Sequence, residues 1–397
     1  MGNKEMNNKR SENKLHLSEL LIENFRGIKG LSIPQLGRVT LLAGRNGVGK
    51  TTVLEAIKVY AGRATYTILQ DLLMAREEFS VGIDEDGDNY YEPEWGALFY
   101  GRDTSEYGEL RVGSRRIEDR FSLEAHSLSD LSEEEVGIFD RLLPNFFADG
   151  NTHTLKASFE EESWIVPVFF TPGHSLSSFV VDPGTHIIGR SYLAARRKDP
   201  KMPPSLTCES LGPGLIDNSE LSRYWDNVAL RDDENHAVQA LNLIYKDDVD
   251  RVTMIGDDTR SRRMTGRRAA VKLKSQEQRV PLRSLGDGAL RLFGVALALA
   301  NSRDGFLLID EAENGIHYSV QRDYWRMVLQ TARNNNVQVF ATTHSWDCIA
   351  AFARAASEDE NAEGVLVRLE KTGDHLQAVE YSEEDMETSA DQGIEMR

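Results

Sequence analysis

The pattern of apolar residues predicts alternating strands and helices at the start of the chain. Residues 15–25 are rich in apolar side chains, and a second extended run precedes the apolar segment at 38–44. Short apolar runs of this kind predict strands. Residues 51–64 then place apolar side chains at helical spacing. The pattern therefore predicts a strand, a glycine-rich turn and a helix in direct succession.

The middle of the chain has two further patterns. Alternating residues at 152–159 and an apolar run at 164–170 predict an antiparallel accessory sheet within about residues 108–190. Residues 214–245 have the pattern of two or three amphipathic helices, which predicts a helical lobe over about residues 213–250. Strand-like alternation then returns before a final block that begins near residue 283.

These patterns predict an α/β fold with one folded unit at residues 15–380. The two halves of its core are expected at about residues 15–65 and 280–380. A disordered polar tail is expected at residues 1–14 and an acidic tail at residues 381–397. No sustained heptad repeat is present, which argues against a long coiled-coil arm.

Composition limits the classes of function. The chain has 397 residues, of which 40% are hydrophobic, so it can bury a large core. It has neither the apolar core of a signal peptide nor an apolar run long enough for a membrane helix, so a cytoplasmic protein is expected. Only Cys208 and Cys348 are available, which excludes a disulfide framework and a cysteine zinc site. The net charge of −18 disfavours a protein that coats nucleic acid in general.

Residues 44–51 read Gly-Arg-Asn-Gly-Val-Gly-Lys-Thr, a complete phosphate-loop motif between the predicted strand and helix. In this setting glycines let main-chain N–H groups face an anion, Lys50 reaches the β- and γ-phosphates, and the Thr51 hydroxyl binds Mg²⁺. The motif therefore predicts ATP and Mg²⁺ as ligands. The candidate nucleotide-binding residues are Arg45, Asn46, Gly47, Val48, Gly49, Lys50, Thr51 and Thr52.

An apolar strand ending in two acids is predicted at residues 306–311. Successive side chains of a strand point in opposite directions, so Asp310 can face Mg²⁺ while Glu311 polarises the attacking water. Taken alone, this segment could equally begin a helix with acids in its first turn. The phosphate loop upstream favours the catalytic interpretation.

Two further segments carry candidate chemistry. Residues 283–289 place Ser284, Gly286, Asp287 and Gly288 at the start of a predicted helix, which could form a second anion site or an ordinary helix cap. Residues 339–345 form an apolar strand that ends in Thr-Thr-His before another predicted helix. A lone histidine such as His344 is usually a core or surface residue, so the pattern alone assigns it no role.

Together, the segments NGVGKTT, SLGDG, LLIDEAENGIHYS and VFATTHS resemble the SMC and RecF-like branch of ABC-type ATPases. Among these, the ATPase halves of OLD-type proteins are the most similar. The resemblance covers roughly residues 15–65 and 280–355. It implies an ABC-ATPase head that has a phosphate-loop core sheet, an antiparallel accessory sheet and a helical lobe.

The resemblance also assigns roles to residues. It implies that Ser284 to Gly288 form a signature segment, which caps the γ-phosphate held by the phosphate loop of a second subunit. It implies that His344 is the switch histidine, and that Asn314 and His317 lie in a D-loop between the two sites. A head-to-head dimer or a larger homo-oligomer is therefore expected. Gln70 could not be assigned as the Q-loop glutamine.

The same resemblance suggests a biological setting. OLD-type proteins continue into a Toprim nuclease domain, whereas this sequence ends soon after His344, so a nuclease is expected on a separate chain. Stand-alone ATPases of this kind are paired with an effector in bacterial antiphage systems such as PARIS. The alternative is a RecF-like repair ATPase that acts directly on DNA.

Two basic clusters bear on the DNA alternative. Either could contact DNA or an acidic partner, although a solvated basic face is the simpler interpretation, because no aromatic residues are interleaved. The clusters are Arg260, Arg262, Arg263, Arg267, Arg268, Lys272 and Lys274, and the smaller set Arg196, Arg197, Lys198 and Lys201.

Overall fold

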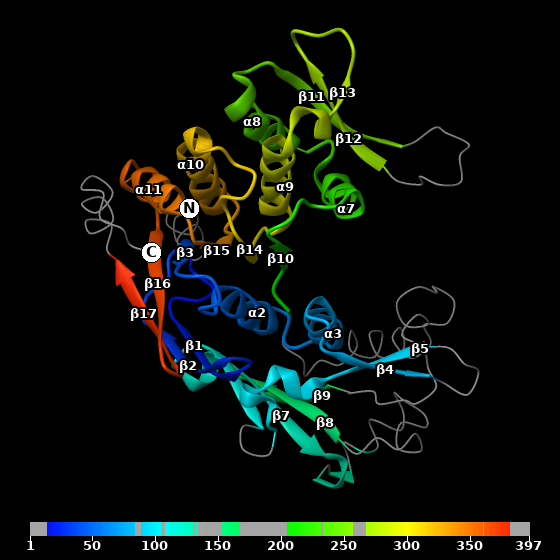
Figure 1. The fold of residues 1–397 in the computed structure, drawn as a ribbon, viewed down its shortest axis with the longest axis vertical. Coiled ribbons are helices and arrows are strands. Elements are labelled where there is room, and N and C mark those ends of the chain that lie inside the picture. The colour runs from blue at the N-terminus through cyan, green and yellow to red at the C-terminus, as the bar shows by residue number, and fades with distance from the viewer. Residues whose placement is uncertain are drawn as a thin grey trace, which may run out of the picture.

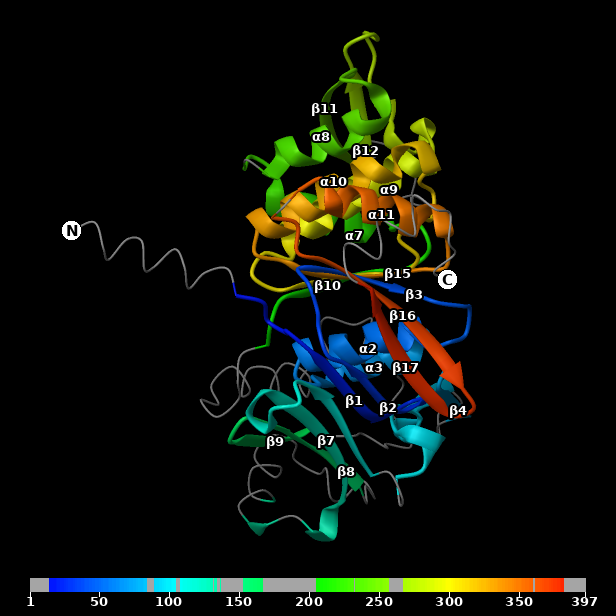
Figure 2. The same cartoon turned by 90° about the vertical axis from the view of Figure 1, so that its left-hand side faces the viewer.

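The computed structural model describes residues 14–381, apart from 84–88, 105–107, 131, 134–135, 137–152, 167–204, 232, 257–266 and 360. A mainly parallel sheet crosses the middle of the molecule (Figure 1). A layer of helices and a small sheet lie on one side of it. Two helices and an antiparallel sheet lie on the other side, as Figure 2 also shows.

The core sheet has the strand order β10-β14-β15-β3-β16-β17. All neighbours in it are parallel except the β16–β17 hairpin. Its strands are β3 (Val39–Ala43), β10 (Cys208–Leu211), β14 (Phe306–Ile309), β15 (Gln338–Thr343), β16 (Gly364–Thr372) and β17 (His375–Tyr381). Because carboxyl ends of parallel strands share one edge, the segments that follow β3, β14 and β15 meet there.

The core sheet is buried on both faces. Leu307 and Ile309 of β14 belong to one hydrophobic core, whereas Phe306 and Leu308 of the same strand belong to the other. This explains the continuous apolar runs that the sequence shows at these strands. On one face lie α9 (Asp287–Asn301), α10 (Tyr318–Asn334) and α11 (Trp346–Ser357); on the other lie α2 (Lys50–Ala61) and α3 (Tyr66–Ala75).

The antiparallel sheet has the order β2-β1-β6-β7-β8-β9. Its strands are β1 (Leu20–Phe25), β2 (Ile28–Ile33), β6 (Glu109–Gly113), β7 (Arg120–Ser127), β8 (His153–Phe159) and β9 (Glu162–Val166). The first two strands fall within the predicted core half at 15–65, yet they pair with this sheet rather than with the core sheet. Alternating burial along β1 agrees with a strand that has one buried face.

The helical lobe contains two described helices and a small sheet. Its elements are α7 (Asn218–Val228), α8 (Asp233–Tyr245), β11 (Val249–Gly256), β12 (Arg267–Leu273) and β13 (Val280–Pro281). Helix α7 begins after Asp217, whose carboxylate accepts from the main-chain N–H groups of Ser219 and Glu220. A separate hairpin pairs β4 (Phe79–Ile83) with β5 (Asn89–Pro93).

Short 3-10 helices connect several of these elements. They are η1 (Trp95–Leu98), η2 (Tyr100–Arg102), η3 (Ile117–Asp119), η4 (Leu128–Asp130) and η5 (Leu282–Leu285). The last of them leads directly into α9.

The predicted α/β class is confirmed, with its phosphate-loop core sheet, antiparallel accessory sheet and helical lobe. The exact domain boundaries stay a prediction, and nearly all of both predicted tails lies outside the described residues. Among the described helices, none combines the length and the apolar character that crossing a membrane requires. Cys208 and Cys348 are free, and burial raises the pKa of each thiol to about 12.

Candidate active site

The phosphate-loop motif forms the turn between β3 and α2. Gly47 and Gly49 have φ angles of 74° and 115°, which a residue with a side chain rarely adopts. Lys50, the first residue of α2, is buried, and its Nζ donates to the carbonyl oxygens of Gly44 (2.7 Å) and Arg45 (3.1 Å). The ammonium group is thus held beneath the turn, and the helix N-terminus points into the loop that would hold phosphate.

The pKa of Lys50 reflects its buried position near three acids. Burial lowers the pKa of the Lys50 ammonium, and the carboxylates of Asp310, Glu313 and Glu311 oppose that shift. A buried ammonium is suited to bind an anionic ligand, because a phosphate group would compensate for the hydration that burial removes from its charge.

The structure brings the two strongest motifs into direct contact. The Thr51 hydroxyl donates to Asp310 Oδ2 across 3.0 Å, although the residues are far apart in sequence. Thr342 of β15 donates to Asp310 Oδ1 (2.5 Å), and its hydroxyl accepts from the Glu311 main-chain N–H (2.9 Å). Thr342 therefore fixes the end of the acidic strand.

The donor set at this point fits Mg²⁺. A hydroxyl oxygen and a carboxylate oxygen lie within hydrogen-bond distance, and Mg²⁺ is usually held by one or two such groups together with phosphate oxygens and water. Within the described part of the chain, no cluster of three His, Cys, Asp or Glu side chains offers a complete protein cage.

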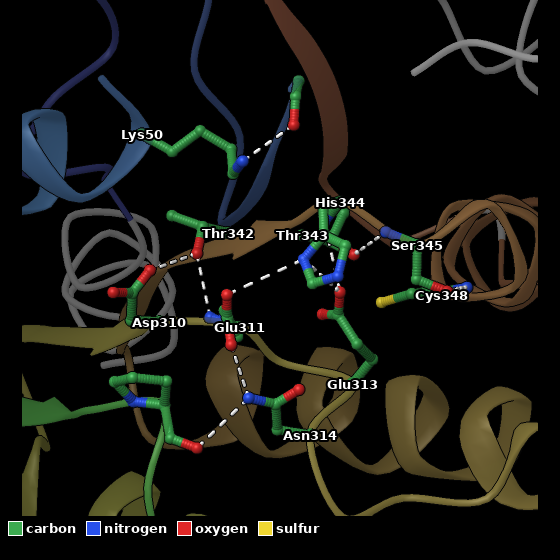
Figure 3. Close-up of polar contacts among 12 residues, drawn as sticks. Lys50, Asp310, Glu311, Glu313, Asn314, Thr342, Thr343, His344, Ser345 and Cys348 are labelled. Atoms are coloured by element: carbon green, nitrogen blue, oxygen red, sulfur yellow. Dashed lines mark hydrogen bonds and ion pairs between the residues drawn. The ribbon is translucent and has the colours of Figure 1, made fainter. Parts of the chain in front are cut away.

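Glu311 and His344 lie side by side next to this contact (Figure 3). Glu311 Oε1 is 3.7 Å from His344 Nδ1, and Asn314 Nδ2 donates to Glu311 Oε2 across 2.5 Å. Asn314 also donates to the carbonyl oxygen of Pro213, in the loop that follows β10. Glu311 has a φ angle of 49°, so its main chain is held in an uncommon left-handed conformation.

The predicted signature segment lies at the amino end of α9. Ser284, Gly286 and Asp287 are exposed there, and Gly286 has a φ angle of 99°. Gly288 packs against the segment after the acidic strand, because a Cβ atom at Gly288 would lie 2.7 Å from the carbonyl oxygen of Gly315. Among the described residues, no hydrogen bond or ion pair joins this segment to the phosphate loop of the same chain.

His317 is placed apart from the acids. Its Nδ1 accepts from the main-chain N–H of Ser319 and so caps α10, and its ring lies 4.3 Å from that of Tyr318. The structure thus brings together Lys50, Thr51, Asp310, Glu311, Asn314 and His344, and it leaves His317 and the signature segment on adjoining exposed surfaces.

The basic residues of the helical lobe mostly have local partners. Arg267 pairs with Asp226 at 2.6 Å, Lys272 donates to the carbonyl oxygen of Glu277, and Lys274 donates to that of Asp247. The remaining arginines of the cluster at 260–263, and the smaller cluster at 196–201, lie outside the described residues.

Sequence reasoning missed three residues at this site. Arg291 of α9 is buried, and its guanidinium donates to carbonyl oxygens in the loop after β10 and at the end of β14. Thr342 and Glu313 both lie in segments that carry candidate residues, but neither was selected. The available signal for Arg291 was an isolated arginine in the otherwise apolar helix that follows the signature segment.

Two protein-family models match separate parts of the chain. Residues 19–170 match a family described as AAA domain, and residues 219–349 match one described as AAA ATPase domain. The first match contains the phosphate loop and the second contains the acidic strand and His344. Both matches support an ATPase.

Two relatives are similar to this chain in sequence, and the name of the first agrees with this class. An ATP/GTP phosphatase of Helicobacter pylori is 22% identical over 366 residues, which cover 87% of this chain and 90% of the relative. An uncharacterized protein of Methanocaldococcus jannaschii is 35% identical over 114 residues, which cover 28% of this chain and 99% of that protein.

Solved structures similar to this chain include SMC heads. The SMC head domain from Thermotoga maritima aligns with a TM-score of 0.44 and 11% identity, covering 92% of this chain and 99% of that one. The Smc head domain from Pyrococcus furiosus, bound to the C-terminal domain of ScpA, aligns with a TM-score of 0.45 and 9% identity, covering 96% and 99%.

Proposed function

We propose that the chain is a Mg²⁺-dependent ATPase whose active site is completed by a second copy of the same chain. The observation that carries this proposal is the 3.0 Å contact between Thr51 of the phosphate loop and Asp310 at the end of β14. The contact supports Mg²⁺ binding, because a hydroxyl and a carboxylate are typical ligands of a metal that also binds ATP phosphates. The name of the Helicobacter pylori relative, ATP/GTP phosphatase, supports hydrolysis as the reaction.

Each residue of the site has a task in this mechanism. Main-chain N–H groups of residues 45–52 and the Lys50 ammonium bind the β- and γ-phosphates. Thr51 and Asp310 would hold Mg²⁺, which neutralises phosphate charge when bound. Glu311 accepts a proton from the attacking water and orients it, and His344 contacts the γ-phosphate from the other side.

The exposed signature segment supports an assembly of two heads. Asp287 is the first residue of α9, where main-chain N–H groups favour an anion, and Ser284 lies in η5 just before it. Among the described residues, neither makes a hydrogen bond to the phosphate loop of its own chain. In a head-to-head dimer they would face the γ-phosphate held by the partner. ATP would then favour the closed dimer, because it contacts both subunits only in that state.

We infer that this ATP-dependent closure controls a separate effector. The motif resemblance to OLD-type ATPases supports a switch or scaffold that holds a nuclease, such as a Toprim protein, in bacterial antiphage defence. The alternative of a repair ATPase acting on DNA is less favoured, because the described residues of the larger basic cluster are paired within the chain.

Light scattering of the Glu311→Gln chain tests the proposal. This variant should bind ATP without hydrolysing it, because the amide cannot accept the proton of water. We expect its mass to rise from monomer to dimer when Mg-ATP is added. Lys50→Ala is the control, and it should stay monomeric because it cannot bind the phosphates.

Other outcomes separate the parts of the proposal. A fixed larger assembly in every condition would favour a constitutive scaffold whose nucleotide controls release of the effector. A monomer in every condition would rule out the head-to-head mechanism. If wild type hydrolyses ATP and the Lys50→Ala chain still does so, the phosphate loop is ruled out as the site.

A further inference from the structure

Glu313 is a buried acid that has no task in the proposed mechanism. It lies between β14 and α10, and its side chain is only 9% exposed. Its Oε2 atom is shielded from solvent and has no hydrogen-bond partner among the described residues. A buried carboxylate lowers stability unless other groups compensate for its lost hydration, so its position requires an explanation in its contacts.

The contacts of Glu313 converge on one residue. Its Oε1 accepts from the main-chain N–H of His344 across 3.1 Å, and it lies 3.4 Å from Nδ1 of the same histidine. Figure 3 shows the Glu313 carboxylate directly beside the His344 ring. One carboxylate oxygen therefore contacts both the main chain and the ring of His344.

Glu311 approaches the same ring nitrogen but is a weaker partner. It lies farther from Nδ1, at 3.7 Å, and its side chain is 33% exposed. Its other oxygen is occupied by Asn314 at 2.5 Å. Because solvent screens the interaction of Glu311 more strongly, Glu313 has the larger effect on the ring. Glu311 thus stays available to water, while Glu313 holds the histidine.

We propose that Glu313 is a positioning residue that selects the tautomer and orientation of His344. A hydrogen on Nδ1 is donated to Glu313, so that Nε2 is the nitrogen available to the nucleotide. In the described part of the chain Nε2 has no polar partner. The partner of one ring nitrogen determines the tautomer of a histidine, which is the basis of this assignment. The catalytic consequence rests on the proposed ATPase function, whereas the tautomer does not.

Nitrogen NMR of the nucleotide-free full chain tests the tautomer directly. Spectra of ¹⁵N-histidine protein are recorded near pH 8.5, well above the usual histidine pKa of about 6.5. His344→Gln identifies the signal by its loss. We expect wild type to carry the hydrogen on Nδ1, and both Glu313→Ala and Glu313→Met to move the population toward Nε2.

Two variants complete the comparison. Glu313→Gln keeps an oxygen that can accept from His344, so it should retain most of the Nδ1–H form. Tyr324→Phe is the matched control, because the Tyr324 hydroxyl is also buried and has no hydrogen-bond partner in the described part of the chain, and none of the His344 contacts involves it. It should leave the tautomer unchanged.

ATP hydrolysis gives a second readout. Glu313→Ala should lower kcat about 10- to 100-fold, as loss of an orienting partner commonly does, with a smaller change in KM. Glu313→Gln should restore most of kcat. An Nε2–H tautomer in wild type, or an unchanged Nδ1–H tautomer in the folded Ala and Met variants, would overturn the proposal.

The two proposals fail in different ways. If wild type does not hydrolyse ATP but its His344 tautomer depends on Glu313, the positioning contact stands and the proposed ATPase function fails. If wild type hydrolyses ATP at a rate that is unchanged in folded Glu313→Ala, the function stands and the positioning role fails.

Discussion

The guanidinium of Arg291 donates to the main-chain carbonyl oxygen of Asp310 across 2.9 Å. The same group donates to Gly212 at 2.6 Å, in the loop after β10. Arg291 lies one turn into α9, the helix that begins with the signature segment. The Arg291 side chain therefore links this helix directly to the main chain of the candidate metal ligand.

We predict that Arg291→Met lowers both stability and ATP hydrolysis. Burial lowers the pKa of Arg291, so its surroundings do not favour its charge. Loss of the guanidinium, however, leaves the carbonyl oxygens of Gly212 and Asp310, whose hydrogen bonds to Arg291 are partly buried, without this donor. A loss of about 1–3 kcal/mol is expected, the typical penalty for such groups. Urea unfolding of the nucleotide-free chain measures it.

The conservative variant sharpens this prediction. Arg291→Lys retains a charge, but one ammonium cannot span both carbonyl groups as the planar guanidinium does, so kcat should stay low. Arg326→Lys on α10 is the control, because Arg326 forms exposed ion pairs with Asp323 and Glu358. An Arg291→Lys chain with wild-type kcat would refute a role in holding Asp310.

The contact between Gly288 and Gly315 leads to a second prediction. Alanine normally favours a helix over glycine by about 1 kcal/mol. At Gly288, however, the new Cβ would lie 2.7 Å from a main-chain oxygen, so α9 or the segment after β14 must shift. We expect Gly288→Ala to destabilise the chain by about 1–3 kcal/mol and to reduce hydrolysis.

Gly294 provides a matched control in the same helix. An alanine there would meet the Ile216 side chain at 3.2 Å, which can move more easily than main chain. Urea unfolding of both variants should show a clear loss for Gly288→Ala and little change for Gly294→Ala. Equal behaviour of the two would mean that the tight contact with Gly315 has no energetic consequence.

Local patterns in the sequence predict much of the site. The glycines and Lys50 follow one strand, and Asp310 follows another, so their approach could be predicted from parallel strands whose carboxyl ends meet. Membership of the sheets was harder to predict. The apolar pattern of β1 identifies a strand, but it does not identify the strand with which it pairs.

Side chains that bond to main-chain atoms leave little signal in the sequence. Arg291 bonds to carbonyl oxygens, which every residue has, so no partner residue type marks the contact in the sequence. The contact between Glu313 and His344 depends on how the ends of β14 and β15 are aligned, which follows from the parallel register of two strands distant in sequence. Three-dimensional packing was needed to identify both.

His16 leads to a prediction about pH. Burial lowers its pKa, and the positive charge of Arg38 lowers it further. The unfolded chain therefore binds a proton at His16 more readily than the folded chain does. The stability contributed by the neutral ring is present above the usual histidine pKa of about 6.5 and is lost as pH falls through the folded pKa.

Urea unfolding at pH 7.5 and pH 5.5 tests this prediction. Wild type should lose stability on acidification, and His16→Phe should lose less, because phenylalanine cannot bind a proton and can retain the edge contact with Phe306. For each protein, the free energy of unfolding at pH 5.5 is compared with that at pH 7.5, so any effect of the substitution that does not depend on pH cancels. An equal loss in both proteins would exclude His16 as a source of the pH dependence.

Mixing two inactive variants tests whether each site needs two chains. Lys50→Ala disables the phosphate loop, and Ser284→Arg disables the exposed signature segment by adding a bulky side chain. Each variant alone should be inactive. In a mixed dimer, however, the intact phosphate loop of one chain faces the intact signature segment of the other, so one complete site is formed.

The expected recovery can be estimated. Equal mixing that exchanges subunits freely makes half of the dimers mixed, and each has one working site of two, so about a quarter of wild-type activity is expected. A chain that carries both substitutions is the control, because it cannot complete a site when it is mixed with either single variant. Mixing it with Lys50→Ala should give no activity, since neither chain then has a working phosphate loop. Activity of Ser284→Arg alone at the wild-type rate would instead show that the signature segment is not part of the site.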